Sequence, residues 1–490
     1  MSIRYEAMPD VPPRFLIAGD EDLFREFAPV WMAEVGDATF VDVANKLVRD
    51  LERDLRRVPG LPALLLLFAA PPLNEAAIRA ATSEALAKDV IVRVLPTSWL
   101  DERAQTGDDV VALLRQMRRA RRRDPFDLAR PASPDEFFGL EGLLDELRGA
   151  DVDVPILLHG MRTSGKTSVA QRLVDYRRGA GWITPRTIEG FGGDCVATLK
   201  RLVEVVAEAS DCRPAQWADP ARPSSPEALA ALEQCALRIR QQPGKVAFIA
   251  LIDEADDLVP RGDDNDHTRA FYTLLHVARE AARQRLVQTV FVALDSEIAT
   301  RNRFPGDAGA NGNPLFNKCF VRRMEPLRPE EAQRFLSETA LLVGYEWTPD
   351  GLTRATQASG GHPFLLRRLG SGALSVSRAR SKQGAALADD DVARAIAREL
   401  EGGCRCAEYF RAQLESLGPA ATAIIESLRD LPMRQSEIRQ RLQPQVVSGA
   451  LRDLDDAFRL TQAYRLVVRD SEGRLDLFAP MFRDWLRDYR

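Results

Sequence analysis

The sequence predicts an α/β fold in which a parallel sheet is covered by helices, and three features lead to this prediction. A glycine-rich loop lies between an apolar run and a helical stretch. A second run, almost entirely apolar, ends in two acidic residues, and the first hundred residues alternate short apolar runs with helical patterns. Such alternation is typical of sheets with helices on their faces. A length of 490 residues corresponds to roughly three domains at about 150 residues each.

The glycine-rich loop runs from Gly160 to Thr167 and has the pattern Gly-x4-Gly-Lys-Thr. An apolar run over 154–158 precedes it and a helical stretch over 168–176 follows, which is the strand, loop and helix context that this motif requires. Backbone N–H groups and the helix N-terminus then face the phosphates. We expect Lys166 to bridge the β- and γ-phosphates and Thr167 to ligate Mg²⁺. The residues expected to bind nucleotide here are Gly160, Arg162, Thr163, Ser164, Gly165, Lys166, Thr167 and Ser168.

The nearly all-apolar run over 245–252 reads as a strand buried on both faces, and Asp253 and Glu254 follow it directly. Two acids delivered at the carboxyl end of a buried strand fit the Walker B arrangement. We expect Asp253 to hold the Mg²⁺ water shell and Glu254 to orient or deprotonate the attacking water.

Composition narrows the functional classes. The net charge is −5, which gives no reason to expect a polyanion-binding protein as a whole. Arginine supplies 60 of the 67 basic residues, so the arginine run over 115–123 fits a solvated helix face better than a nucleic-acid grip. The six cysteines lack the paired spacing of a zinc site. The longest apolar run, 63–70, is too short to span a bilayer, and nothing resembles a signal peptide. We therefore expect a cytoplasmic protein with no membrane partner.

Residues 1–100 predict a three-layer α/β domain with a mostly parallel sheet. We expect a sensory or docking role rather than catalysis. The acidic stretch over 19–22 has no matching aspartate after the third strand, and no strand carries the Asp/Glu-x-Lys pair of a nuclease. Residues 101–135, a basic helix followed by prolines, form the expected linker. The expected strands are 14–18, 38–43, 63–68 and 90–95, and the expected helices are 21–34, 44–57 and 74–87.

From residue 124 to the end, the chain resembles the ATPase module of signal-transduction ATPases with numerous domains (STAND) and their archaeal-type AAA+ relatives. The resemblance rests on four ordered segments: the entry sequence 124–139, the phosphate loop about twenty residues later, the segment 314–331, and Ser359-Gly-Gly-His-Pro-Phe364. It implies an AAA+ P-loop ATPase core over 136–327 and a helical lid over 328–402.

The resemblance also implies further nucleotide-site residues. Phe138 and Gly139 would pack against the adenine, although Leu140 replaces the family's usual arginine. Asp295 and Ser296 follow the apolar run 287–294, where AAA+ proteins place a polar residue that senses the γ-phosphate. His362 and Pro363 would lie against the nucleotide and report its state to the lid. The candidates for an arginine that acts on a neighbour's phosphate are Arg301, Arg303, Arg322 and Arg323.

Residues 403–490 predict a winged helix, with helices at 406–416, 419–429, 435–442 and 446–458, a hairpin over 464–478 and a last helix at 481–489. The would-be recognition helix carries one arginine, Arg452, against Asp453, Asp455 and Asp456. From residue 405 onward there are 14 basic and 13 acidic side chains. Because phosphate contacts supply most nucleic-acid affinity, we favour a protein-contact or autoinhibitory role over DNA reading.

Taken together, the sequence predicts a regulatory ATPase that binds ATP or ADP with Mg²⁺ and hydrolyses ATP slowly. ADP would keep the lid and winged helix closed over the core, and exchange for ATP would open the molecule and permit homo-oligomerisation or contact with a protein partner. Two alternatives stay open. One is a DNA-associated remodelling or origin-recognition-like AAA+ ATPase, and the other is an ATPase-regulated effector with a nuclease-like N-terminal domain.

Overall fold

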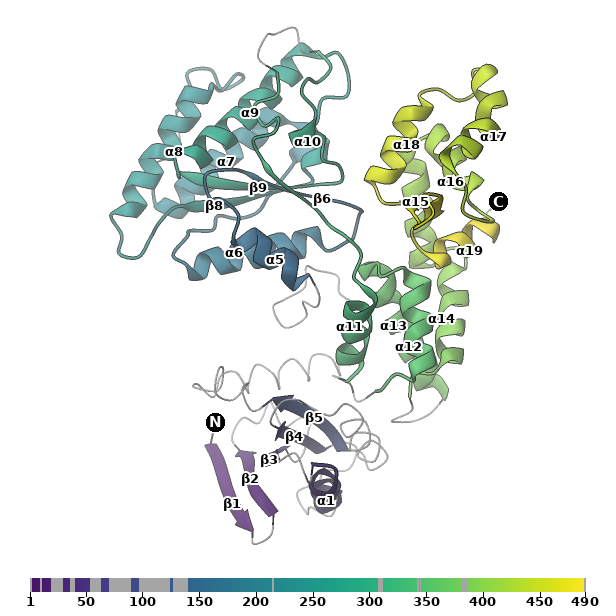
Figure 1. The fold of residues 1–490 in the computed structure, drawn as a ribbon. Helices are drawn as coiled ribbons and strands as arrows, with labels where there is room; N and C mark the ends of the chain where they lie inside the picture. The colour runs from purple at the N-terminus through teal and green to yellow at the C-terminus, as the bar shows by residue number, and fades with distance from the viewer. Residues whose placement is uncertain are drawn as a thin grey trace. The chain divides into compact units, whose positions relative to one another are not determined.

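The computed structural model forms two compact units. The first combines residues 1–129 with 328–361 and 365–409, and the second combines 130–327 with 362–364 and 410–490. Figure 1 shows the elements of both. The structure describes residues 2–8, 11–18, 30–35, 40–52, 63–69, 90–96, 124–126, 140–213, 216–306, 312–341, 343, 345–380 and 386–488.

The core of the second unit is a five-stranded parallel sheet in the order β10-β6-β9-β8-β7. Parallel strands all end at one edge, so the loops that follow them gather there. The phosphate loop begins after β6, which lies between β10 and β9 in this order. The strands of the sheet are β6 (Ile156–His159), β7 (Ile188–Glu189), β8 (Phe248–Asp253), β9 (Val287–Ala293) and β10 (Phe320–Arg323).

Helices cover both faces of this sheet, which explains why β8 and β9 are apolar on both sides. Alternate side chains divide between the two faces: Val290 joins the cluster beneath α5 and α6, while Phe291 joins the cluster beneath α7, α8 and α9. Figure 1 shows the same layering. These helices are α5 (Glu141–Arg148), α6 (Lys166–Gly179), α7 (Cys195–Ser210), α8 (Ser225–Arg240) and α9 (Asn265–Arg283).

Helix α8 was not among the elements predicted from the sequence. The signal was nevertheless present in the sequence. Ser224 caps the helix and accepts a hydrogen bond from the backbone N–H of Glu227, while the Glu227 side chain accepts one from the backbone N–H of Ser224. This is a capping box with proline in the first turn, a recognised helix start.

Residues 124–126 fall in the expected linker but pack against helices of the first unit that lie within the predicted lid, residues 328–402. Phe126 is fully buried, meets the ring of Phe335 edge to face, and lies against Gly370. Asp124 accepts a hydrogen bond from Ser371. This part of the chain is therefore an anchor in the lid. The lid helices are α11 (Pro329–Leu341), α12 (Pro349–Ser359), α13 (Pro363–Arg380) and α14 (Asp389–Leu400).

Replacing Gly370 with alanine should destabilise the lid. A Cβ atom there would lie 2.5 Å from the Phe126 ring, so either the ring or helix α13 must shift. We expect a loss of about 1–3 kcal/mol in the free energy of unfolding, measured by thermal or denaturant unfolding. Gly402→Ala is the matched control, because a Cβ there meets nothing within 4 Å. Equal stability of the two variants would contradict this packing.

The N-terminal sheet differs from the prediction in two respects. Its order is β1-β2-β3-β4-β5, and two of its pairings are antiparallel and two parallel, so the sheet is mixed rather than mostly parallel. The predicted strand at 38–43 is wrong, because helix α1 (Phe40–Glu52) begins there. Part of the predicted helix 21–34 is also wrong, since β3 occupies 30–35. The strands are β1 (Ser2–Met8), β2 (Val11–Ala18), β3 (Val30–Val35), β4 (Ala63–Ala69) and β5 (Val90–Pro96).

The expected helix 74–87, the acidic stretch 19–22 and the arginine run 115–123 lie outside the described residues. The predicted strands at 63–68 and 90–95 agree with β4 and β5. In the core, β7 covers only Ile188–Glu189, and one isolated bridge joins Ile183 to Phe248.

The C-terminal module, residues 405–488, consists of helices and a two-stranded hairpin. The predicted helix 446–458 is wrong as a single element: α17 ends at Val447, and α18 begins after Asp453, which has a positive φ of 53°. The other boundaries agree to within a few residues. The elements are α15 (Arg405–Leu417), α16 (Pro419–Ser427), α17 (Gln435–Val447), α18 (Leu454–Ala463), β11 (Val467–Arg469), β12 (Leu475–Leu477) and α19 (Pro480–Asp488).

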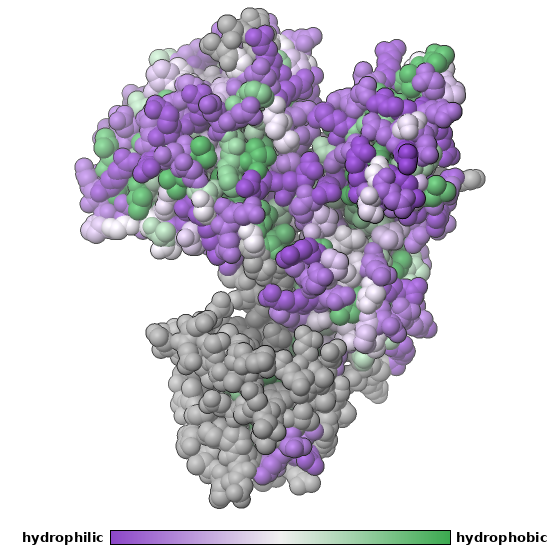
Figure 2. Space-filling view, viewed as in Figure 1, coloured by the Kyte–Doolittle hydropathy of each residue, from purple (hydrophilic) through white to green (hydrophobic). Residues whose placement is uncertain are grey.

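Hydrophilic residues cover most of the core and C-terminal module on the face shown in Figure 2. The exposed large hydrophobic residues, such as Leu237 and Val447, are scattered through the sequence, as is usual for protein surfaces. Among the described residues, no helix combines the length and apolar character needed to cross a bilayer.

Candidate nucleotide site

The loop after β6 adopts a conformation that its glycines make accessible. Gly160 has φ of 146° and Gly165 has φ of 94°, values that side-chain-bearing residues rarely adopt. A Cβ atom on Gly160 would also lie 3.1 Å from the Cβ of Met324. Thr163 has a φ of 57° without being glycine, and strained backbone of this kind is common at ligand-binding loops.

Lys166 opens helix α6 and is 9% exposed. Its Nζ donates hydrogen bonds to the carbonyl oxygens of Gly160, at 2.8 Å, and Met161, at 2.7 Å. Burial lowers the pKa of Lys166 to about 8, partly opposed by the charges of Asp256 and Asp253. The Lys166 ammonium is thus held against the phosphate loop. Its acceptors are neutral carbonyl oxygens, which charged phosphate oxygens can replace.

Thr167 and Asp253 come together across the sheet although 86 positions separate them. The Thr167 hydroxyl donates to Asp253 Oδ2 at 2.8 Å, and Asp253 Oδ1 accepts from the backbone N–H of Glu254 at 2.9 Å. A hydroxyl and a carboxylate are hard oxygen ligands of the kind that suit Mg²⁺, which also retains waters and phosphate oxygens. The donor set therefore fits magnesium. Among the described residues, no group of three or more His, Cys, Asp or Glu side chains is arranged to hold a metal on its own.

Glu254 follows β8 in a left-handed conformation, with φ of 52°, and its side chain is exposed. The backbone next to it is tightly constrained, because a Cβ atom on Gly190 would lie 2.7 Å from the Glu254 carbonyl oxygen. The carboxylate thus stands at the carboxyl edge of the sheet, next to Asp253, where a general base would have to be.

Asp256 belongs to this site although sequence reasoning missed it. Its Oδ1 accepts a hydrogen bond from the backbone N–H of Leu294 at 2.9 Å, which joins the ends of β8 and β9. Burial raises the pKa of Asp256, while that hydrogen bond lowers it. The signal in the sequence was a third acid in the run that begins at Asp253.

Asp295 and Ser296 follow β9, the neighbour of β6. Asp295 is held by the backbone N–H of Glu297 at 3.2 Å and the Ser296 hydroxyl at 3.4 Å. His159, the last residue of β6, is buried, and burial lowers its pKa to about 4. The charges of Arg323 and Lys166 lower it further, whereas Asp295 raises it. Asp295 therefore lies within electrostatic range of the residue that immediately precedes the phosphate loop.

His362 is 1% exposed and lies against the phosphate loop. Burial lowers its pKa to about 3, the charge of Lys166 lowers it further, and a backbone hydrogen bond with Arg162 opposes this. The His362 ring also meets Phe478 of the C-terminal module at 5.6 Å between centroids. The structure thus brings His362 to the loop. Pro363 begins α13.

The remaining predicted residues are placed less centrally. Phe138 and Gly139 lie outside the described residues, and Leu140 has a φ of 64° at the start of α5. Arg162 and Thr163 are exposed on the loop, Ser164 is buried, and Ser168 continues the first turn of α6.

Of the four candidate arginines, two have partners within the chain. Arg322 Nε lies 2.7 Å from Glu146, and Arg301 lies 3.7 Å from Glu297. Arg303 and Arg323 have exposed side chains. An arginine acting on a neighbouring subunit stays a prediction.

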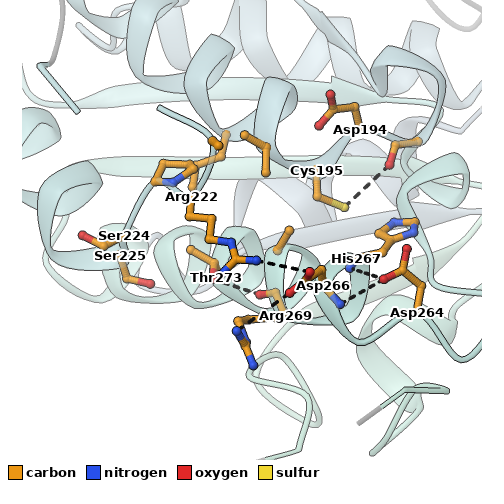
Figure 3. A pocket seen from close by; sticks show the side chains of 16 residues that line it. Asp194, Cys195, Arg222, Ser224, Ser225, Asp264, Asp266, His267, Arg269 and Thr273 are labelled. Atoms are coloured by element: carbon orange, nitrogen blue, oxygen red, sulfur yellow. Dashed lines mark hydrogen bonds and ion pairs between the residues drawn. The ribbon is translucent and has the colours of Figure 1, made fainter. Parts of the chain in front are cut away.

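A separate cavity of about 650 Å³ opens between the N-termini of α7, α8 and α9 (Figure 3). It contains no residue of the phosphate loop. Two of its side chains, Cys195 and His267, contact the Leu258 carbonyl oxygen, at 3.4 and 3.1 Å, and so fix the turn that follows Glu254. Burial raises the pKa of Cys195 to about 12, so its thiol stays protonated. The N-termini of α7 and α9, which open onto this cavity, are both capped by aspartate side chains.

Comparisons with known proteins support the fold. No protein-family model and no curated protein matches the chain. A solved Walker-type ATPase of Pyrococcus abyssi is similar over 74% of this chain and 99% of that one, with 17% sequence identity and a TM-score of 0.52. The Orc1 protein of Aeropyrum pernix in complex with DNA (17% identity, 73% and 94% covered, TM-score 0.35) and the RuvB Holliday junction branch migration motor of Thermotoga maritima (14%, 71% and 95%, TM-score 0.37) match less well. The predicted α/β fold, a parallel sheet covered by helices, is confirmed.

Proposed function

We propose that this chain is an AAA+ ATPase of the STAND type that acts as a regulatory switch. Its nucleotide state governs how the C-terminal module, interpreted as a winged helix, engages the ATPase core, and engagement in turn governs opening of the molecule and assembly with further copies or a protein partner. Hydrolysis is slow and resets the switch.

The observation that carries this proposal is the joint position of the phosphate loop and the C-terminal module. His362 makes a backbone hydrogen bond with Arg162, lies within electrostatic range of Lys166, and meets the ring of Phe478 edge to face. Phe478 belongs in turn to an aromatic cluster with Phe410 and Phe482. His362 thus links the phosphate loop to the core of the module. A ligand shifts such an equilibrium only by its different affinities for the two states.

In the proposed reaction Lys166 holds the β- and γ-phosphates, and Thr167 and Asp253 hold Mg²⁺. The metal supplies charge neutralisation at the phosphates when bound. Glu254 takes a proton from the attacking water. Arg162, Ser164 and the loop backbone orient the phosphates. In this scheme the ATPase core is residues 136–327, the lid is residues 328–402 and the winged helix is residues 403–490.

The winged-helix interpretation does not by itself make the module a DNA reader. Several of its arginines are already paired: Arg439 with Asp455, Arg474 with Asp470, and Arg483 with Asp476. A paired guanidinium contributes less to phosphate binding than an unpaired one. These pairs favour a protein-contact role, and we expect weak, sequence-independent DNA binding at most in a gel-shift assay.

Size-exclusion chromatography with identification of the co-purified nucleotide tests the switch. The full chain should elute differently with ADP and with ATP, and Glu254→Gln should stay in the ATP-dependent position because it binds but does not hydrolyse. The elution position of Lys166→Ala should not change with either nucleotide. If wild type and both variants elute alike under every condition, the switch proposal is wrong even where nucleotide binds.

A further inference from the structure

Arg459, on helix α18 of the C-terminal module, contacts three carboxylates at once. Its Nη1 lies 3.2 Å from Asp295 Oδ2, its Nη2 lies 2.9 Å from Glu297 Oε1, and its Nε donates to Asp456 Oδ1 at 3.0 Å. The side chains of Asp295 and Glu297 are only 12% and 16% exposed, whereas Arg459 is 45% exposed. Arg459 thus supplies both core carboxylates with a counter-charge from another part of the chain, although Glu297 also lies 3.7 Å from Arg301.

The residues after Arg459 extend this contact along the same edge of the sheet. Arg465 pairs with Glu325, which follows β10. Burial raises the pKa of Tyr464, which lies within electrostatic range of Asp256. Asp256 follows β8. The module therefore faces the ends of β8, β9 and β10, and this carboxyl edge is where parallel α/β sheets bind their ligands.

An aspartate at the end of β9 poses an electrostatic problem for a phosphate site. The charge of Asp295 raises the pKa of His159, next to the phosphate loop, and the last four residues of β9 pair with β6. A carboxylate at this edge would repel a terminal phosphate bound there unless a cation intervenes. Arg459 is such a cation, and its fork can engage two carboxylates in a fixed geometry.

We propose that Arg459 is a positioning residue that lets the site distinguish a nucleoside triphosphate from a diphosphate. This inference rests on the nucleotide site proposed above. Its guanidinium neutralises Asp295, so that the edge beside the phosphate loop accepts the charge of the terminal phosphate. A diphosphate has no phosphate at this position, so its affinity does not depend on the pair of Arg459 and Asp295.

Linkage gives this arrangement a second consequence. If docking of α18 favours a triphosphate, a triphosphate favours docking of α18 by the same factor. The Arg459 contact is then tighter with ATP than with ADP.

The test measures affinities for ADP and for the non-hydrolysed β,γ-imido analogue of ATP by titration calorimetry at one fixed ionic strength, because exposed charges are screened. Arg459→Ala should weaken binding of the triphosphate analogue by about tenfold and leave ADP binding nearly unchanged. Adding Asp295→Asn removes the repelling charge, so the double variant should recover most of the loss. Arg459→Lys should lie between wild type and Arg459→Ala.

Arg452→Ala is the matched control, because Arg452 is an exposed arginine of the same module, and it should bind both nucleotides as wild type does. The inference is overturned if Arg459→Ala weakens both nucleotides equally, weakens neither, or is not rescued by Asp295→Asn. A wild-type chain that binds neither nucleotide overturns the proposed function as well. Binding of both with no effect of Arg459 overturns only the inference. Thermal unfolding of each variant shows that it is folded.

Discussion

Lys166→Ala is expected to lower the affinity for both ADP and ATP by about a hundredfold. The Lys166 ammonium is buried and donates hydrogen bonds to two carbonyl oxygens of the loop itself, so it is already positioned for phosphates. A hydrogen bond to a charged group contributes about 1.5–3 kcal/mol, and about 1.4 kcal/mol is a factor of ten in affinity. Equilibrium titration with each nucleotide measures the effect.

Lys245→Ala is the matched control, since Lys245 is an exposed lysine of the same core and its loss should leave both affinities unchanged. The melting temperature of Lys166→Ala must be compared with wild type, because two hydrogen bonds to the loop are lost as well. An unchanged nucleotide affinity in a folded Lys166→Ala chain would remove the phosphate loop from the mechanism.

Glu254→Gln is expected to lower the rate of hydrolysis by about 10²–10⁴ while affinity for nucleotide stays within a few-fold of wild type. Glutamine keeps the size of the side chain and can orient water, but it cannot accept a proton. The exposed position of Glu254 beside Asp253 allows water to reach it. Single-turnover hydrolysis with the full chain separates this chemical step from product release.

Asp257→Asn serves as control for Glu254→Gln. Asp257 is an exposed acid three positions further along the same turn, so it changes the local charge by the same amount without removing the base. A similar fall in rate in both variants would show that local charge, and not proton transfer, sets the rate.

Strands that are mostly apolar were the most predictable part of the fold. The predicted strands at 245–252 and 287–294 overlap β8 and β9, because burial on both faces favours apolar side chains. The polar residues of β9, Gln288 and Thr289, are buried as well. The predicted strand at 38–43 failed for the opposite reason. Its valines suggested a strand, yet the buried residues Ala44, Leu47, Val48 and Leu51 follow helical spacing and determine the element.

The candidate site was predictable where local sequence carries its chemistry and not where the fold brings distant residues together. Gly160, Lys166 and Asp253 stand in short motifs with a fixed mechanical reason. Nothing local marks Arg459, because its partner Asp295 is 164 positions away. The predicted helix 446–458 also ended one residue short of it. Charge counting over the module missed that this arginine faces the core and not a nucleic acid.

The anchor at Phe126 bears on how the protein can be dissected. Phe126 fills the space between α11 and α13, against Phe335 and Gly370. A fragment beginning at residue 140, the natural place to cut when only the phosphate loop is considered, would leave a hole the size of a benzyl group in the lid. The shortest faithful fragment therefore retains residues 124–126.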